Sequence, residues 1–368
     1  MSSSPERKKI GPDSVMERAR AVIEACRTAD GFNASAGLYR ELWLRDLVYS
    51  QGPLLKLGYA PTIRRHLETF LLYQRRTGQL PTVVSKGLRR LFNQRFHSWT
   101  ADTELLFIIG AQEYATKSRD LDFLEEHREA IDRCLGFVRR RLNFRGLLPG
   151  ADWRDAIPNL DNKFLLSNQI LLVDVYEALG RREDSDRLKE IVRDVFCSPD
   201  AAYPVDCVCW EGAGGGSPKR ELRLDSLGTS LSILNGTLSG PAASEAAETF
   251  NLALTHYGNK NLVPPVRINR KQAFVSAHAL NSYVRNGAFF RNRPGHYQNS
   301  AVWPFIEARI VAALWKTGQV ERARELSAMM IGREGFSEWY SPITGNPHGS
   351  KDQLWTAAAV LEQVLPRP

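Results

Sequence analysis

Two acidic residues of this 368-residue chain stand in strongly apolar segments. Asp155 lies in the segment DWRDAIP, and Glu338 lies in the segment FSEWY. Apolar surroundings favour the protonated form of a carboxyl group, which a general acid needs near neutral pH. Hydrolysis of a glycosidic bond uses two carboxyl groups that flank the bond, one protonated and one ionised. Asp155 and Glu338 are therefore the best candidates for paired acid–base chemistry.

Two further aspartates compete for these roles. Asp152 lies three residues before Asp155 and is a second candidate for the acid. Asp46 directly follows Arg45, and a neighbouring guanidinium favours the ionised form of a carboxylate. We therefore expect Asp46 to bind a hydroxyl group rather than to donate a proton.

Tryptophan, carboxylate, arginine and amide side chains recur together in five segments. These are YRELWLRDL, FHSWTADTELLF, LLPGADWRDAIPNLDN, RPGHYQNSAVWPF and GFSEWYSPITGNPHGSKDQLWTA. Ligand sites combine aromatic walls with a few polar groups, a mixture that suits the ring faces and hydroxyls of a saccharide. A single tryptophan beside an Arg-Asp pair is more often a packed loop anchor. Five such segments between helices favour a ligand site.

The chain lacks the sequence signatures of other catalytic classes. The chain has no G-x-S-x-G segment and no P-loop lysine motif, and we interpret EGAGGGSPKR at 211–220 as a surface loop between helices. The five cysteines lack the spacing of a zinc site, so we expect reduced thiols, no metal and no cofactor. Of the seven histidines, His278 and His296 lie near polar clusters. For His296, substrate contact and a structural hydrogen bond are equally open.

Composition is that of an ordinary globular protein. The formal net charge is +8, but the basic residues are scattered among acids, which does not favour nucleic-acid binding. The chain has no run of about 18 apolar residues and no signal-peptide pattern, so we expect a soluble, cytoplasmic protein without membrane contact. The oligomeric state is open, and a homo-oligomer is compatible with the sequence.

Helices must position the polar segments, because apolar residues recur at spacings of three and four along most of the chain. We expect a first helix that begins at Ser14, where Glu17 completes a capping box, and few strands. Helical stripes also cover 131–142 and 188–196. Further helices are expected near 44–57, 61–77, 101–116, 165–180, 226–238, 242–257, 274–284, 299–317, 319–331 and 352–364.

About a dozen helices without a dividing linker indicate a single domain, preceded by a flexible N-terminus at 1–12. A solenoid of helical pairs would repeat with a period of roughly 30 to 45 residues, and no such period is present. A closed ring of helical hairpins is the alternative. Such a ring would display the five polar segments on one rim.

An ordered series of motifs resembles the six-hairpin glycosidases. The motifs are, in chain order, LWLRD, SWTADTELLFI, DWRDA, RLDSLGTSLSIL, HYQNSAVWPF and FSEWYSPITGNPHGSKDQLWTAA. The likeness runs from about residue 38 to residue 364 and is strongest to the alkaline/neutral invertases and to the glucosidase domain of glycogen debranching enzymes. It implies an all-α, single-domain (α/α)6 toroid and an inverting glycoside hydrolase that needs no metal, nucleotide or covalent intermediate.

The resemblance also implies roles for single residues. Asp155 matches the general acid, and Glu338 matches the base that activates water. Trp43 and Asp46 match the element that holds the glycosyl ring, with Arg45 orienting Asp46. From this match and from the polar segments, the expected substrate-binding residues are Trp43, Arg45, Asp46, Asp102, Trp153, Arg154, His296, Asn299, Trp303, Trp339, Gln353 and Trp355.

Two departures from the family bear on the substrate. Ser300 stands where relatives have glycine, and Ala156 and Ile157 replace a basic pair after the acid. We expect a small saccharide, sucrose first and then trehalose, glucosylglycerate or the ends of α-glucan chains. The two carboxyl groups of an inverting enzyme should lie about 6.5 to 9.5 Å apart. The alternatives are a sugar epimerase on the same toroid, using His278 and His296, and a non-catalytic carbohydrate-binding scaffold.

Overall fold

The computed structural model describes residues 12–85, 99–210, 217–268 and 292–365. Its helices are α1 (Pro12–Cys26), α2 (Leu44–Lys56), α3 (Ala60–Leu71), α5 (Asp102–Ser118), α6 (Asp122–Glu126), α7 (Arg128–Arg139), α8 (Leu166–Ala178), α9 (Arg182–Phe196), α10 (Ser226–Leu234), α11 (Gly240–Glu248), α12 (Phe250–Ala253), α16 (Pro304–Lys316), α17 (Val320–Ile331) and α18 (Leu354–Val364). Its strands are β1 (Arg27–Thr28), β2 (Gly31–Phe32), β3 (Leu42–Trp43), β4 (Val83–Val84), β5 (Phe164–Leu165), β6 (Val205–Cys209), β7 (Lys219–Asp225), β8 (Leu254–Thr255), β9 (Gly258–Asn259), β10 (Leu262–Val263), β11 (Trp339–Tyr340) and β12 (Pro347–His348).

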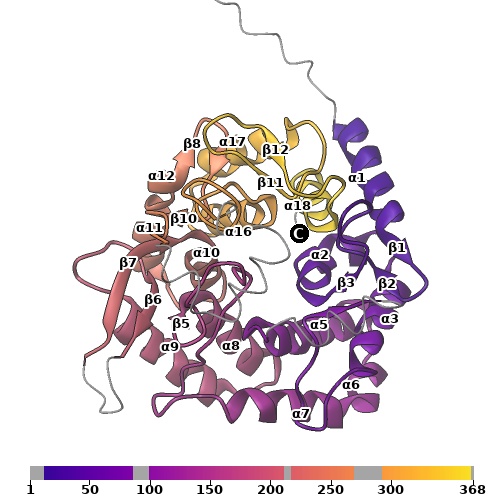
Figure 1. Ribbon diagram of the computed structural model, residues 1–368, viewed down its shortest axis with the longest axis horizontal. Helices are drawn as coiled ribbons and strands as arrows, with labels where there is room; N and C mark the ends of the chain where they lie inside the picture. The colour runs from indigo at the N-terminus through magenta and orange to yellow at the C-terminus, as the bar shows by residue number, and fades with distance from the viewer. Residues whose placement is uncertain (1–11, 86–98, 211–216, 269–291, 366–368) are drawn as a thin grey trace, which may run out of the picture.

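Six helices close an inner ring. In order they are α2, α5, α8, α10, α16 and α18; each packs against the next, and α18 packs back against α2. Helices α1, α3, α7, α9, α11 and α17 pack on the outside of this ring, each against one or two of its members (Figure 1). The arrangement is the (α/α)6 toroid expected from the sequence, and it excludes the solenoid.

The sequence distinguishes inner from outer helices by how many faces are apolar. In α8 ten of thirteen residues are buried, so the helix is covered on nearly all sides. In α9, which packs on α8 from outside, five of fifteen residues are buried, and they form one stripe. Across the ranges that the structure describes, none of the helices combines the length and apolar character that crossing a bilayer requires.

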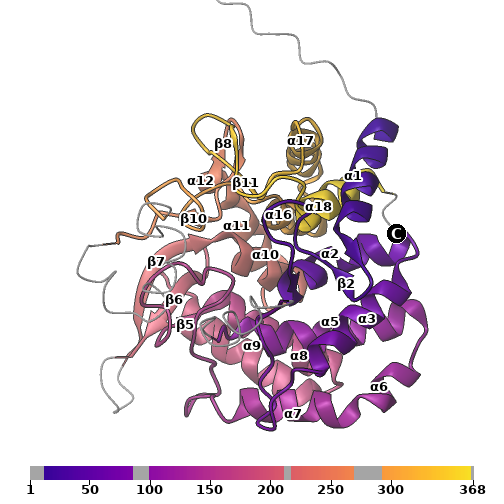
Figure 2. The same ribbon diagram turned by 45° about the vertical axis from the view of Figure 1, so that its right-hand side comes forward.

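The two ends of the chain meet at a seam where α18 packs against α1 and α2 (Figure 2). The backbone amide of Leu354 donates to the carbonyl of Ala34 at 2.9 Å, and that of Ala36 donates to Asp352 at 3.2 Å. Ser35 and Gln353 form an isolated β-bridge beside these bonds. The C-terminal polar segment therefore shares a rim with the N-terminal one.

A four-stranded antiparallel sheet, in the order β10, β7, β6 and β5, is the main feature that the sequence analysis missed. Strands β6 and β7 stand on either side of the Gly-rich segment, of which residues 211–216 lie outside the described residues. Our expectation that this segment joins two helices was wrong. Strand β6 is buried on both faces, so it lacks the alternation that marks a half-exposed strand.

Most predicted helices have counterparts close to their expected positions. The predicted capping box at Ser14 is wrong, because α1 begins at Pro12 and Ser14 lies inside its first turn. Proline is favoured at the first helical position, where it needs no backbone N–H. The expected helix at 274–284 lies outside the described residues, as do residues 1–11, which were expected to be flexible.

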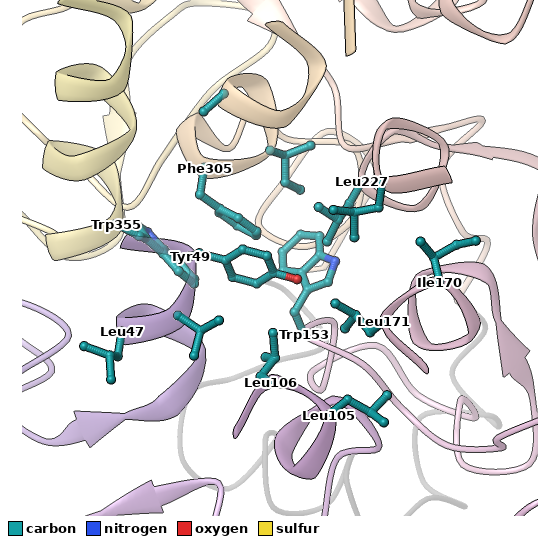
Figure 3. Close-up of a cluster of buried hydrophobic side chains, with 14 of the residues drawn as sticks. Leu47, Tyr49, Leu105, Leu106, Trp153, Ile170, Leu171, Leu227, Phe305 and Trp355 are labelled. Carbon is teal, nitrogen blue, oxygen red and sulfur yellow. The ribbon is translucent and has the colours of Figure 1, made fainter. Parts of the chain in front are cut away.

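Apolar side chains from all six inner helices meet in the middle of the ring (Figure 3). The ring of Phe305 on α16 stacks on that of Trp355 on α18, with centroids 4.5 Å apart. Trp153, from the loop before α8, packs edge-on against Phe305 at 5.4 Å. The polar side chains at the helix starts therefore lie next to a core from which water is excluded.

Replacing Phe305 with alanine should destabilise the protein by about 3–5 kcal/mol, because the residue is 1% exposed and its ring contacts four other aromatic residues. The measurement is urea unfolding followed by circular dichroism. Leu72→Ala serves as control: Leu72 is 79% exposed, and the change should stay within about 0.5 kcal/mol. Equal losses in the two variants would contradict this description of the core.

Candidate active site

The expected site residues gather where the inner helices begin. Arg45 and Asp46 lie in the first turn of α2, and Asp102 is the first residue of α5. Gln353 is the N-cap of α18. The starts of neighbouring helices are joined by side chains: Arg45 donates to Asp102, and Gln353 donates to Asp46. These contacts place the polar segments on one rim of the toroid.

Asp155 is the partly exposed member of a buried turn. Among residues 151–157 it is the one that is not buried, and its side chain is 23% exposed. Gln298 clamps this turn: its Nε2 donates to Asp155 Oδ1 at 3.0 Å and to the carbonyl of Trp153 at 2.7 Å, and its Oε1 accepts from the amide of Ala156 at 2.8 Å. The carboxyl group of Asp155 is accordingly accessible and also held in one orientation.

Arg45 is oriented toward Asp102 and Asp155, which corrects the expectation that it orients Asp46. Its Nε and NH2 donate to the two carboxylate oxygens of Asp102 at 2.8 and 3.2 Å. Its NH1 lies 3.6 Å from Asp155 Oδ2. Both oxygens of Asp102 are thus occupied by Arg45, and the buried Asp102 supports the arginine instead of facing a ligand.

Asp46 is buried, and its Oδ1 accepts a hydrogen bond of 2.8 Å from Gln353 Nε2. Burial raises the pKa of Asp46 to about 7, although Arg45 and Gln353 act in the opposite direction. The adjacent guanidinium therefore does not keep Asp46 firmly ionised, contrary to our expectation. Burial raises the pKa of Asp46 more than the positive charge of Arg45 lowers it, because Arg45 is already paired with Asp102.

Glu338 precedes strand β11 and is 3% exposed. Its backbone amide donates to the carbonyl of Ser350 at 2.8 Å, and the amide of Ser350 donates to Glu338 Oε2 at 2.9 Å. Two residues earlier, the carbonyl of Phe336 accepts from the amide of Gln353. Glu338 is thus tied to the same turn that delivers Gln353 to Asp46.

A path of hydrogen bonds, one ion pair and chain neighbours links Asp155 to the segment that carries Glu338. From Asp155 it runs through Arg45 to its neighbour Asp46, and from there through Gln353 to the segment of Glu338. Residues more than 180 positions apart in the chain therefore belong to one polar cluster on the rim. The sequence had placed both among candidate residues but could not show how they are connected.

Asp152 and Arg154 belong to a buried ionic cluster, so neither is placed to contact a ligand as we expected for Arg154. Arg154 is 1% exposed and donates to both oxygens of Asp152 and to Asp206 Oδ1 at 2.6 Å. Its NH2 also lies 3.7 Å from Asp225 Oδ2. Ser167, at the start of α8, donates to Asp152. These partners leave Asp155 as the accessible acid of the turn.

Several other residues that we expected to bind substrate are buried beneath the rim, where they support it. Trp153 and Trp303 are buried against each other, with ring centroids 5.1 Å apart, and Trp355 is buried beneath them against Phe305. The Asn299 side chain bonds only to backbone in the described residues: Oδ1 accepts from Val266, and Nδ2 donates to the carbonyls of Val266 and Asn292. In the described structure these residues support the rim through packing and backbone hydrogen bonds.

His296, Trp339 and Trp43 border the cluster. Trp339 is 8% exposed, stacks on His348 at 4.3 Å and meets the edge of His296 at 5.9 Å. Burial lowers the pKa of both His296 and His348. Trp43 ends strand β3 just before α2 and is half-buried. His278, the other half of the histidine pair that an epimerase would need, lies outside the described residues.

Sequence reasoning missed several residues of this arrangement, above all Gln298, Asp206, Asp225 and Ser167. Gln298 stands in the HYQNS segment that attracted attention, but nothing local distinguishes it from its neighbours. Asp206 lies on the unpredicted strand β6 beside a shift in the strand register, and Asp225 is the N-cap of α10. A buried acid that follows a strand and begins a helix could have been recognised by its capping position.

A group of side chains that lie close enough together to bind a metal ion is found elsewhere, on the outer helices. In the described part of the chain, Glu68, Glu126 and His127 bring potential ligand atoms within 4.8 Å of one another. Arg64 already forms ion pairs with Glu68 and Glu126, so its guanidinium occupies the place of a cation. This group belongs to the surface ion pairs of α3, α6 and α7 rather than to the rim.

Arg154→Met should destabilise the protein by about 3–5 kcal/mol, because it leaves three buried aspartates without their shared cation. Guanidinium chloride unfolding measures the loss. Arg128→Met is a matched control, since Arg128 is 65% exposed and pairs with the exposed Glu125, and its effect should stay within about 0.5 kcal/mol. A loss of that small size for Arg154→Met would show that the ionic cluster does not hold the turn.

Comparison with known proteins adds a family match. Residues 266–356 match the family described as Mannosylglycerate hydrolase MGH1-like glycoside hydrolase domain. That range contains Glu338, Gln298 and Gln353, whereas Arg45 and Asp155 lie before it. The matched quarter of the chain therefore supplies one of the two candidate carboxyl groups.

Two curated proteins align with shorter parts of the chain. Glucosylglycerate hydrolase of Mycolicibacterium hassiacum is 41% identical over 73 residues, which are 19% of this chain and 16% of that protein. Mannosylglycerate hydrolase of Rubrobacter radiotolerans is 35% identical over 89 residues, 23% of this chain and 20% of that protein. The aligned parts thus span a fifth or less of these relatives. Their names differ from the invertases, which the sequence motifs had suggested first.

Solved structures resemble the chain over nearly its whole length. The GH63 mannosylglycerate hydrolase from Thermus thermophilus, in complex with Tris and D-glycerate, aligns with a TM-score of 0.69 and 14% identity, covering 95% of this chain and 99% of that one. The GH78 family rhamnosidase of a Bacillus species aligns with a TM-score of 0.64 and 16% identity, covering 95% and 34%. At such identities the likeness concerns the fold. It shows that the chain has the (α/α)6 fold of these proteins, and residues 266–356 are similar to a glycoside hydrolase domain.

Proposed function

We propose that the protein is an inverting glycoside hydrolase that cleaves a small α-glycoside. The observation that carries the proposal is the rim cluster, which joins an accessible, clamped Asp155 to Glu338 through Arg45, Asp46 and Gln353. The family match at residues 266–356 and the glycosidase fold support the same chemistry.

In the proposed mechanism the two carboxyl groups act in one step. Asp155 gives its proton to the glycosidic oxygen, and Glu338 takes a proton from a water molecule that attacks the opposite face of the sugar. Gln298 and Arg45 hold the carboxyl group of Asp155 in place before the reaction, so little orientation has to be gained in the transition state. The chain needs no covalent intermediate for this reaction.

The glycosyl ring is proposed to lie against Trp43 and Asp46. Asp46 is held by Gln353 and lies beside the arginine that contacts Asp155, so a hydroxyl bound to Asp46 would place the glycosidic bond near the acid. A carboxyl group with a pKa of about 7 exchanges readily between donor and acceptor states, and both can bind a sugar hydroxyl.

Glucosylglycerate and mannosylglycerate are the substrates we propose first, because the aligned relatives carry the names of hydrolases of these two compounds. Sucrose, our first choice from the motifs alone, now follows with trehalose and short α-glucans. All are small α-glycosides. Glucosylglycerate and mannosylglycerate differ in the glycosyl ring, whereas the glucosides differ from one another in the leaving group, which is the part that we propose the turn after Asp155 contacts.

Stereochemistry tests the proposal directly. The protein should be incubated with glucosylglycerate, mannosylglycerate, sucrose, trehalose and maltose while NMR follows the first sugar released. An α-glucoside should yield β-glucose first, since water attacks the face opposite the leaving group. Release of α-glucose would indicate a retaining mechanism, and absence of any release from the panel would favour the binding scaffold or the epimerase.

Replacing each proposed catalytic group by its amide tests the roles. Asp155→Asn and Glu338→Gln should each lower kcat by about 10³-fold or more, because neither amide can transfer the proton. Both variants should show unchanged circular dichroism spectra. Glu334→Gln, an exposed acid four residues before Glu338, is the control and should keep normal turnover. Near-normal activity of Glu338→Gln would remove Glu338 as the base.

A further inference from the structure

The hairpin that follows Glu338 folds back onto it. Strands β11 and β12 pair with Trp339 opposite His348 and Tyr340 opposite Pro347. Directly after β12, residues Gly349 and Ser350 return to Glu338. The Ser350 amide donates to Glu338 Oε2 at 2.9 Å, while the amide of Glu338 donates to the carbonyl of Ser350 at 2.8 Å. One end of the hairpin therefore holds both backbone and side chain of the glutamate.

Gly349 lies against the carboxyl group itself. Its φ is +74°, and a Cβ atom at this position would lie 2.2 Å from Glu338 Oε2, 2.8 Å from its Cβ and 2.9 Å from its Cδ. Contacts below 3.0 Å require one of the two groups to move. Gly349 is itself exposed, so core packing does not account for its lack of a side chain. The atoms that exclude a side chain here belong to Glu338.

We propose that Gly349 is a positioning residue for Glu338: its missing side chain lets the Ser350 amide bind Oε2 and so fixes the direction of the carboxylate. The inference rests on the proposed role of Glu338 as the base. A base must point its lone pair at the attacking water, and an error of about 1 Å in such a group can lower the rate on the order of 10²-fold. Substrate binding depends on other residues, so the ground-state affinity should be spared.

Another glycine of the same region provides the matched control. Gly335 also has a φ of +74°, and it lies three residues before Glu338, yet its added Cβ would meet no heavy atom of the described chain within 4 Å. Alanine at position 335 therefore adds the strain of a left-handed backbone without a steric clash. Alanine at position 349 adds the same strain together with the clash on Glu338.

The first experiment compares the kinetics of wild type, Gly349→Ala and Gly335→Ala on the substrate found for the wild type. We expect kcat of Gly349→Ala to fall about 100-fold with KM within about threefold, whereas Gly335→Ala keeps kcat within about threefold. Equal kcat values for the two variants would overturn the positioning role while leaving the proposed function intact. A wild type without hydrolase activity would overturn both.

The second experiment is a double-mutant cycle in thermal stability, which needs no activity. Glu338→Ala removes Oε2 and Cδ, the atoms that a side chain at 349 meets at 2.2 and 2.9 Å. Gly349→Ala should therefore lower Tm more in the wild type than in the Glu338→Ala background, by on the order of 3 °C. If Gly349→Ala folds only in that background, the coupling is likewise supported. Equal Tm losses in both backgrounds would overturn the proposal.

Discussion

The inner helices of the toroid begin beside one another, so the polar side chains in their first turns are buried and must find partners among the neighbouring loops. An unpaired polar group in such a place costs about 1–3 kcal/mol, so partners from the loops stabilise the fold. Asp102 receives Arg45, Asp46 receives Gln353, and Asp152 receives Ser167. The rest of the rim is arranged around these bonds.

The first turn of α16 also contains a buried polar side chain that finds its partners in neighbouring loops. Glu307 in its first turn is fully buried; Arg333 donates to Glu307 Oε1 at 2.8 Å, and the amide of Asn259 donates to the same oxygen at 3.1 Å. This acid joins α16 to strand β9 and to the loop that follows α17 instead of facing the site. Glu307 is therefore a rim carboxylate whose partners hold neighbouring loops together.

The helices could be predicted because each inner or outer helix is marked by its apolar faces over one short window of sequence. The toroid was implied by the resemblance of the ordered motifs, and the segments around Asp155 and Glu338 were recognisable by composition. The partners were not predictable: Gln298 is 143 positions from Asp155, and Gln353 is 307 positions from Asp46. No local pattern encodes contacts across such separations. The four-stranded sheet was missed for a related reason, since strand β6 is covered on both faces and lacks alternation.

The ion pairs of Arg45 are formed with residues distant in the chain and not with its sequence neighbour Asp46. Arg45 is adjacent to Asp46 in the chain, but the guanidinium gives its short bonds to Asp102 and reaches Asp155 only at 3.6 Å. A buried arginine without an acidic partner would carry an uncompensated positive charge, which is costly. Pairing with Asp102 neutralises much of that charge while keeping the guanidinium in position. Asp102 thereby holds the arginine that contacts the proposed acid, and this support comes from a residue 57 positions away in the chain.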